Sequence, residues 1–138
     1  MQPGEIFHHS RFYVDRATGE FKGKYLLILA VAAGDVIFRP LTSQPRPEVP
    51  ECHHGLPYPS FYLGVLGGRL RKQSWLDLTK RADMEVSQLH DEMNVGIAIR
   101  EATLAQDLFL RALQCAAGAD DTTPMQEKTI RDLLAILR

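Results

Sequence analysis

Residues 24–31, KYLLILAV, followed by the turn residues Gly34 and Asp35 and by residues 36–39, VIFR, determine the fold that this sequence predicts. The first run is apolar almost throughout and too short for a typical isolated helix, so it predicts a strand that is buried on both faces. Residues 36–39 then return as its hairpin partner. The two runs therefore predict the central antiparallel pair of a β-sheet.

Further strands are expected around this pair. Residues 4–14 predict a strand that enters a hairpin through the turn residues 15–19. Residues 61–66 resume strand character, and residues 74–78 alternate polar and apolar side chains as a half-buried strand does. The first half of the chain is therefore expected to form a small antiparallel β-barrel.

A proline-rich segment interrupts these strands. Residues 43–59 contain five prolines, which remove backbone donors and prevent a regular helix or a central strand. The segment is expected to be a long surface loop. Loops of this length without secondary structure are uncommon in compact domains and are often functional, and a poorly ordered excursion is an equally consistent interpretation.

Helical periodicity replaces the strand patterns after Asp83. Residues 84–93 predict a short helix, and residues 98–116 predict a long one, because their apolar side chains recur at steps of three and four. Thr123, followed by a proline and by a glutamine three residues on, forms a capping-box pattern that opens a last helix ending at Leu137.

Together these segments predict an α+β fold in one domain, residues 1–138, with the barrel in residues 1–81 and packed C-terminal helices in residues 82–138. Charge divides at the same boundary. The first part holds eleven Lys and Arg against seven Asp and Glu, and the second holds five against ten. Such a split is common on solvated surfaces, but it also permits a basic face for phosphates on the strand-rich part.

Composition favours a cytoplasmic protein without a membrane segment. The longest apolar run, residues 25–33, is about half the length of a membrane helix. Residues 1–5 carry no basic segment followed by an apolar stretch, which is the mark of a secretory signal. Cys52 and Cys115 lie far apart and do not resemble a disulfide framework, so a reducing compartment is expected.

No familiar catalytic or metal-binding motif is complete in the sequence. Residues 51–54, ECHH, invite a metal-site interpretation, because Cys and neutral His bind zinc. Adjacent residues rarely ligate one ion, and the second half of a paired motif is missing, so neither a metal nor a cofactor is expected. The sequence also lacks a Walker loop, a dinucleotide-binding glycine pattern, a nucleophile elbow and an HExxH helix.

Cations and hydroxyls gather at the predicted strand ends. Lys24 opens the central strand, and Thr42 and Ser43 close its hairpin partner. In an antiparallel pair, Lys24 lies about ten residues before the turn and Thr42 about eight after it, which makes them near neighbours. An ammonium group suits phosphate, and a hydroxyl can donate to an oxygen on which charge develops. The sequence therefore predicts an anion pocket at one rim of the sheet.

Five segments, in order, resemble features of the PemK/MazF-type toxins, the endoribonuclease half of a toxin–antitoxin pair. The family has a Gly-acidic-Ile/Val-aromatic strand, a basic residue before Val/Leu repeats, an apolar-Thr-Ser strand end, a later strand and a short helix after it. The matching segments are residues 4–7 (GEIF), 24–29 (KYLLIL), 40–43 (PLTS), 74–78 (SWLDL) and 84–89 (MEVSQL). The resemblance extends from about residue 4 to residue 115.

The resemblance implies a metal-independent endoribonuclease that cuts single-stranded RNA by attack of a ribose 2′-hydroxyl on the adjacent phosphate. By position, Lys24 takes the role of the family's catalytic Arg, and Thr42 takes that of its Thr. The resemblance also implies a homodimer and a cognate antitoxin as partners. Residues expected to bind phosphate or to transfer protons are Ser43, Arg39, Arg71 and His53.

A second interpretation stays open. Lys24 and Tyr25 stand where the family has Arg-Pro, and this departure favours a non-catalytic barrel that binds nucleic acid or a partner protein, as the related CcdB toxins do. A phage or mobile-element accessory protein, whose barrel supports an oligomer, is a third interpretation.

Overall fold

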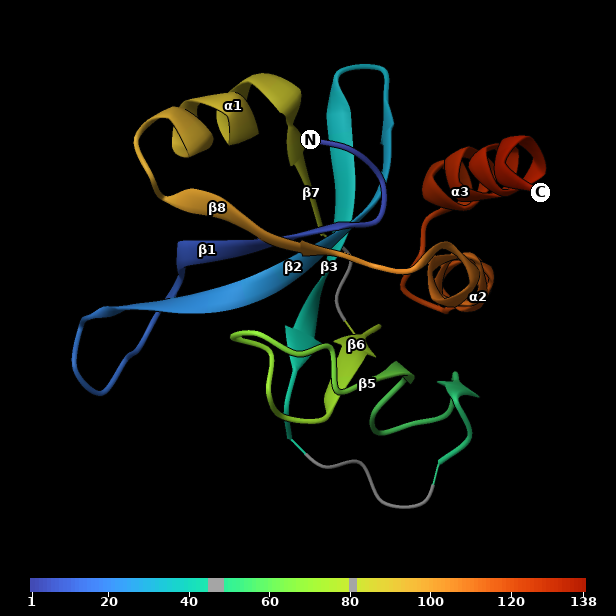
Figure 1. Ribbon diagram of the computed structural model, residues 1–138, viewed down its shortest axis with the longest axis horizontal. Helices are drawn as coiled ribbons and strands as arrows, with labels where there is room; N and C mark the ends of the chain where they lie inside the picture. The colour runs from blue at the N-terminus through green and yellow to red at the C-terminus, as the bar shows by residue number, and fades with distance from the viewer. Residues whose placement is uncertain (45–48, 80–81) are drawn as a thin grey trace.

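The computed structural model describes residues 1–44, 49–79 and 82–138, and within them it has an α+β fold with eight antiparallel strands and three helices (Figure 1). The strands are β1 (Glu5–Val14), β2 (Phe21–Ala32), β3 (Asp35–Thr42), β4 (Cys52–His53), β5 (Ser60–Gly64), β6 (Ser74–Asp77), β7 (Ala82–Glu85) and β8 (Ala98–Thr103). The helices are α1 (Val86–Asn94), α2 (Gln106–Ala117) and α3 (Pro124–Leu137). No helix in these residues is long and apolar enough to cross a membrane.

The hairpin of β2 and β3 forms the centre of the sheet, as the sequence predicts. Cross-strand pairs run from Ala32 opposite Asp35 to Leu26 opposite Pro40. The two-residue turn between the strands has φ values of 54° and 83°, the left-handed conformation of a type I′ hairpin. Residues 26–30 of β2 are all buried, with Leu26 and Ile28 in one hydrophobic cluster and Leu27, Leu29 and Ala30 in another. This burial on both faces accounts for the continuous apolar run.

The sheet bends at β3, which changes partners along its length. Residues 35–38 of β3 pair with β7, and Leu41 and Thr42 pair with β6. The strand order along the sheet is β4-β5-β6-β3-β2-β1-β8. Because β4 and β8 lie at opposite ends of this order, the described strands form an open sheet, and the predicted barrel is not confirmed.

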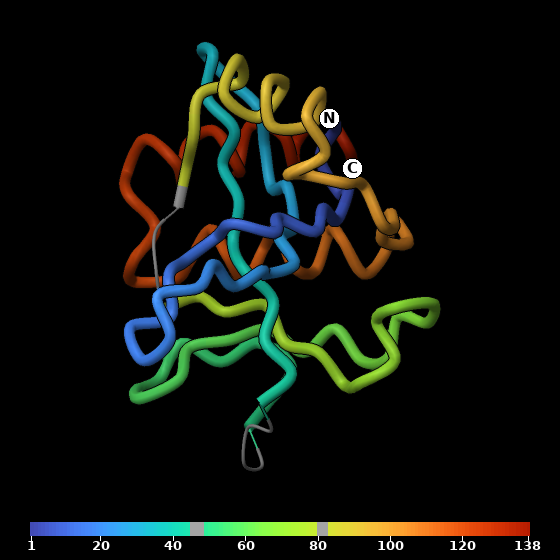
Figure 2. The backbone as a smooth tube through the Cα atoms, turned by 90° about the vertical axis from the view of Figure 1, so that its left-hand side faces the viewer, coloured from blue at the N-terminus to red at the C-terminus, as the bar shows by residue number. Residues whose placement is uncertain are grey.

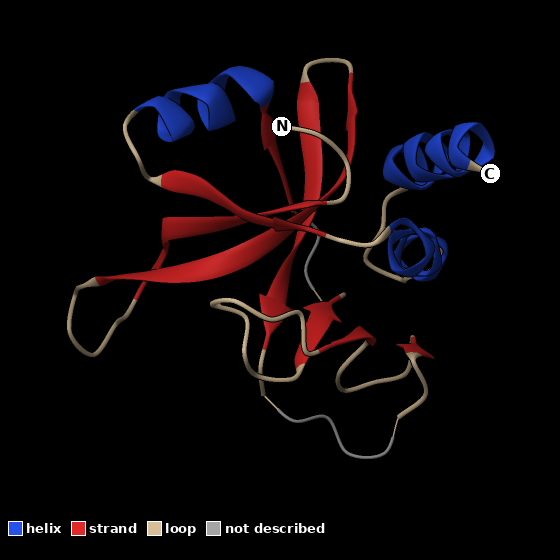
Figure 3. Cartoon of the chain, viewed as in Figure 1, coloured by secondary structure: helices blue, strands red, loops and turns tan. Residues whose placement is uncertain are grey.

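Helices cover the sheet on two sides. The larger cluster packs α2 and α3 against β2, β3 and β5, whereas the smaller one packs α1 against the other face of β2 and β3. Figure 3 shows α1 well apart from the α2–α3 pair. In the view turned by 90°, the orange and red tube of α2 and α3 lies behind the strands (Figure 2).

The second part of the chain contains more than helices, which corrects two predictions. Residues 98–103, expected to open the long helix, form β8 instead, and α2 begins only at Gln106. The alanines there imitate a helical stripe, but β1 has an edge whose backbone groups need partners, and β8 pairs with it from Glu5 opposite Thr103 to His9 opposite Ala98. Strand β7 likewise precedes α1 within the part that was expected to be helical.

The predicted cap of the last helix is confirmed. Thr123 is the N-cap residue of α3, and its Oγ1 accepts a hydrogen bond of 3.1 Å from the backbone N–H of Gln126. The expected proline-rich loop is partly corrected, because β4 lies within it and pairs with β5. Residues 45–48 of that loop lie outside the described residues.

Candidate functional site

A cleft of about 820 Å³ opens at the rim of the sheet, between the start of β2, the end of β3 and the connection from β5 to β6. Figure 1 shows this connection next to the end of β3 and below β2. The described residues that line the cleft are Tyr13, Gly23, Lys24, Tyr25, Leu41, Thr42, Ser43, Gln44, Pro57, Tyr58, Arg69, Leu70, Arg71, Lys72, Ser74, Asp77 and Thr79.

Positive charge predominates in this lining. Its described residues include four cations, Lys24, Arg69, Arg71 and Lys72, and one carboxylate, that of Asp77. Arg69 lies 3.8 Å from Oε1 of Glu101, and its side chain is 79% exposed, so this pair is weak. Among the described residues, the other three cations have no carboxylate within ion-pair distance. The cleft therefore suits an anionic ligand.

The structure brings Lys24 and Thr42 to the same cleft. The last residues that pair between β2 and β3 are Leu26 and Pro40. Lys24 and Thr42 each lie two residues beyond this pair, on β2 and β3 respectively. By that point β3 has turned to β6, where Thr42 pairs with Trp75, and Lys24 pairs with His9 of β1. The divergence of the two strands opens the space between them.

Ser43 and Arg71 also line the cleft, whereas two other predicted residues do not. Arg39 is fully buried, at 0% exposure, and donates from Nη1 to the carbonyl of Phe38 and from Nη2 to Oε1 of Gln126. It connects β3 to α3 and is not accessible to a ligand. His53 lies on β4, outside the residues that line the cleft.

Hydroxyl groups complete the polar wall. Thr42, with 9% of its surface exposed, accepts a hydrogen bond of 3.2 Å from the backbone N–H of Gln44. Because Oγ1 is the acceptor there, the Thr42 hydroxyl hydrogen is free to donate to a ligand. Oδ1 of Asp77 accepts from the backbone N–H and from Oγ1 of Thr79, at 2.9 and 2.6 Å.

Sequence reasoning did not select several residues of this cleft. Asp77 was recognised only as part of an alternating strand, and three tyrosines, Tyr13, Tyr25 and Tyr58, were not assigned to any site. Tyrosine rings are platforms on which bases stack. Only the long-range course of the chain brings residues 57 and 58 near β2, and a local sequence pattern does not carry that information.

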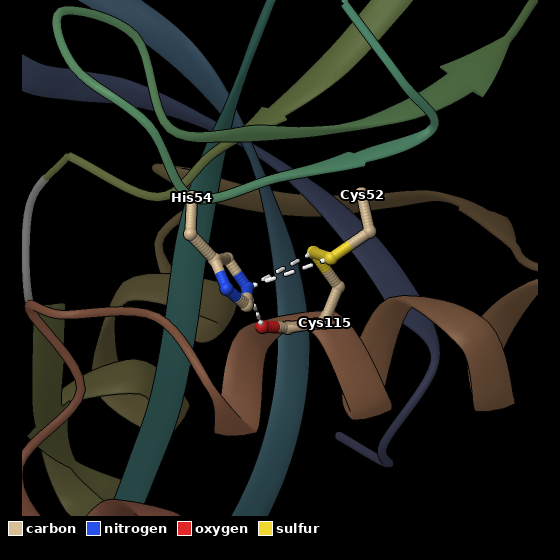
Figure 4. Close-up of side chains that lie close together, drawn as sticks. All are labelled: Cys52, His54 and Cys115. Atoms are coloured by element: carbon tan, nitrogen blue, oxygen red, sulfur yellow. Dashed lines mark hydrogen bonds between the residues drawn. A yellow bond between two sulfur atoms is a disulfide. The ribbon is translucent and has the colours of Figure 1, made fainter.

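A second cluster corrects the prediction that the cysteines are unpaired. Cys52 of β4 and Cys115 of α2 form a disulfide with Cα atoms 5.6 Å apart, and Nε2 of His54 lies 3.4 and 3.5 Å from the two sulfurs (Figure 4). The sequence separation of 63 between the cysteines concealed this proximity. The disulfide removes the argument from cysteine for a reducing compartment, so the cytoplasmic location stays a prediction.

Comparison with known proteins gives no match: no family model, no curated protein and no solved structure corresponds to this chain. The chemistry of the cleft and the resemblance of the quoted segments are therefore the grounds for a functional proposal.

Proposed function

We propose that the cleft binds single-stranded RNA and that the protein is a metal-independent endoribonuclease of the PemK/MazF toxin type. One observation carries this proposal: Lys24 and Thr42, which the resemblance assigns to catalysis, line one cleft together with Arg71. A groove with cations for the backbone and aromatic rings for the bases is the usual form of a single-strand binding site.

The proposed reaction breaks one phosphodiester bond. The ribose 2′-oxygen loses its proton and attacks the adjacent phosphorus, the bond from phosphorus to the 5′-oxygen breaks, and that oxygen takes up a proton from solvent. The products are a 2′,3′-cyclic phosphate and a 5′-hydroxyl end. As charge grows on the non-bridging oxygens, the ammonium of Lys24 and the free hydroxyl hydrogen of Thr42 stabilise it.

Asp77 is the proposed general base. It supplies the one carboxylate among the described lining residues, and both hydrogen bonds from Thr79 go to its Oδ1. These bonds hold the carboxylate in place and leave Oδ2 for the proton of the 2′-hydroxyl. No histidine is among the described residues that line the cleft.

Cleavage of a labelled, unstructured RNA in the presence of a chelator tests the activity. Lys24→Ala and Thr42→Val are each expected to lower the rate by at least about 100-fold, since each removes a group that stabilises the transition state. Asp77→Asn is expected to lower it by about 100-fold or more. Lys22→Ala is the matched control, because Lys22 lies on the same strand two residues away and does not line the cleft.

The chemistry of the products provides a second criterion. Replacement of the ribose at the cleavage position by 2′-deoxyribose is expected to abolish cleavage, because it removes the attacking oxygen. Cleavage that survives this replacement, or that survives both Lys24→Ala and Thr42→Val, contradicts the proposal.

A non-catalytic RNA-binding role is the second candidate. It is favoured by the Lys at position 24, where the family has Arg, because an ammonium cannot form the bidentate contact that a guanidinium makes with phosphate. Tight binding of single-stranded RNA without turnover, with Lys24→Arg equally inactive, selects this candidate. The homodimer and the cognate antitoxin stay predictions of the resemblance, and the mass of the purified protein in solution tests the homodimer.

A further inference from the structure

Three side chains with metal-binding atoms converge where β4 meets the C-terminal end of α2. Sγ of Cys52, Sγ of Cys115 and Nε2 of His54 lie within 4.8 Å of one another. Figure 4 shows the His54 ring pointing at both sulfurs from the chain just after Cys52. We propose that, when the disulfide is reduced, these three side chains bind a Zn²⁺ ion.

The spacing of the ligand atoms already resembles that of a tetrahedral zinc site. Zinc lies about 2.3 Å from thiolate sulfur and about 2.0 Å from imidazole nitrogen, which places a sulfur and a nitrogen ligand about 3.5 Å apart in a tetrahedral site. The observed distances from Nε2 of His54 to the two sulfurs are 3.4 and 3.5 Å. Only the two sulfurs have to separate, to about 3.8 Å.

The backbone permits this separation. Cys52 belongs to a two-residue strand at the end of the sheet and is exposed, so its side chain can rotate once the disulfide bond is broken. Cys115 is buried, at 2% exposure, on a regular helix and stays in place. The site therefore has one fixed and one movable thiolate.

The imidazole is positioned by the end of the same helix. Nε2 of His54 lies 2.8 Å from the backbone carbonyl oxygen of Cys115, so Nε2 carries the proton in the disulfide form. A Cβ atom at Gly118 would lie 3.0 Å from Cε1 of His54, so the glycine leaves space for the ring. Binding of the ion requires this proton to move to Nδ1, which frees the Nε2 lone pair.

A fourth coordination position faces solvent. The two cysteines and His54 line a cavity of about 470 Å³ together with Glu51, Arg111 and Arg138. Glu51 pairs with Arg111 at 3.4 Å and is not among the converging ligand atoms. Three protein ligands and one water molecule would complete a tetrahedral site, an arrangement found where zinc stays open to an added ligand.

Thiol chemistry connects the two forms. A dithiol reductant transfers two electrons and two protons to the disulfide, its own thiols become a disulfide, and Zn²⁺ then displaces the protons of Cys52 and Cys115. Hydrogen peroxide reverses the change. The two thiolates transfer two electrons to the peroxide and form the S–S bond. The O–O bond breaks, and the two oxygen atoms take up two protons from solvent to give two water molecules. The ion is then released.

Metal titration of the purified full-length chain tests the proposal. The protein is reduced with a phosphine, freed of reductant under inert gas, and titrated with Zn²⁺ against a chromophoric chelator and with Co²⁺. We expect one equivalent of either ion to bind, and the Co²⁺ form to show a thiolate-to-metal charge-transfer band. The oxidised protein is expected to show neither.

Single variants identify the ligands. Cys52→Ser and His54→Ala are each expected to weaken Zn²⁺ binding by at least about tenfold. Even the loss of a residue that only hydrogen-bonds to a metal ligand lowers metal affinity by about that factor. His53→Ala is the matched control and is expected to bind as the wild type does, because His53 is not part of the cluster. Far-ultraviolet circular dichroism verifies that each variant is folded. Less than stoichiometric binding by the reduced wild type, equal binding by its oxidised form, or a loss with His53→Ala as large as with His54→Ala overturns the proposal.

Discussion

Nη2 of Arg39 on β3 donates a hydrogen bond of 3.0 Å to Oε1 of Gln126 on α3, across 87 positions of the sequence. The guanidinium is fully buried, and Gln126 is only 5% exposed. Gln126 therefore has a role that its place in a capping-box pattern does not indicate: it attaches the last helix to the central hairpin. Nε2 of Gln126 also contacts Oδ2 of Asp83, at 3.4 Å.

Gln126→Leu is expected to lower the free energy of unfolding by about 2 to 3 kcal/mol, because it removes an acceptor from a buried charged donor. Urea unfolding followed by circular dichroism measures the change. Gln106→Leu, an exposed glutamine on the first turn of α2, is the matched control and should stay within about 0.5 kcal/mol of the wild type. Equal effects of the two variants would show that the contact with Arg39 does not stabilise the fold.

Glu5 predicts a dependence of stability on pH. Burial by itself raises the pKa of this carboxyl, but the hydrogen bond from Arg100, the backbone N–H of Gln2 and the terminal ammonium lower it more, so the net pKa lies below the usual 4.5. A lowered pKa in the folded state means that ionised Glu5 adds stability above pH 4.5 and that this stability is lost as the pH falls through the folded pKa.

Glu5→Gln is therefore expected to be less stable than the wild type at pH 7, by about 1 kcal/mol, with a difference that shrinks below the unfolded pKa. Unfolding in urea at a series of pH values measures the two curves. Glu20→Gln, in the exposed turn between β1 and β2, should leave the curve unchanged. A deficit for Glu5→Gln that persists undiminished in acid would assign the loss to packing instead of charge.

Local patterns were sufficient for the elements with strong local signals. The apolar run of β2, the turn at Gly34 and the cap at Thr123 each depend on neighbours within a few residues, so the sequence alone predicts them. β8 was missed because its strand conformation depends on pairing with β1, about ninety residues away. Closure of a barrel likewise requires that strands far apart in the sequence pair at the two ends of the sheet, and β4 and β8 lie at opposite ends of the strand order.

The candidate site was predictable to the same extent. Lys24 and Thr42 were expected to be near neighbours because one hairpin relates them, and both line the cleft. Tyr58 and Arg69 also line the cleft, but they belong to other segments, and no local sequence pattern predicts where those segments lie relative to β2 and β3. The pairing of Cys52 with Cys115 was missed for the same reason, since 63 positions separate them.

The charge of the cleft predicts how the proposed binding of RNA responds to salt. Each cation that contacts a phosphate of a single strand contributes about 0.7 to the slope of log K against log salt concentration. Lys24→Gln and Arg71→Gln are each expected to reduce the slope by about that amount and to weaken binding of unstructured RNA at low salt. Lys22→Gln should leave the slope unchanged, because Lys22 does not line the cleft.

Fluorescence anisotropy of a labelled RNA between low and moderate salt measures these slopes. An RNA with 2′-deoxyribose at the cleavage position, which lacks the attacking oxygen, is used so that no cleavage is expected during the titration. Slopes that fall equally for Lys22→Gln and Lys24→Gln would show that RNA contacts the general surface of the strands and not the cleft.

The disulfide predicts a large difference in stability between oxidised and reduced protein. The Cys52–Cys115 disulfide closes a loop with a sequence separation of 63 and links β4, the strand at one end of the sheet, to α2. In the chain-entropy model a loop of this length is worth about 4 kcal/mol. We expect a phosphine reductant to lower the free energy of unfolding of the metal-free wild type by about 2 to 4 kcal/mol. The double variant Cys52→Ser, Cys115→Ser should match the reduced wild type and should not respond to reductant. Urea unfolding with and without reductant, both with a chelator present, makes the comparison.

A wild type that unfolds at the same urea concentration in both conditions would mean that packing of α2 against β4 and β5 holds this end of the sheet without the covalent link.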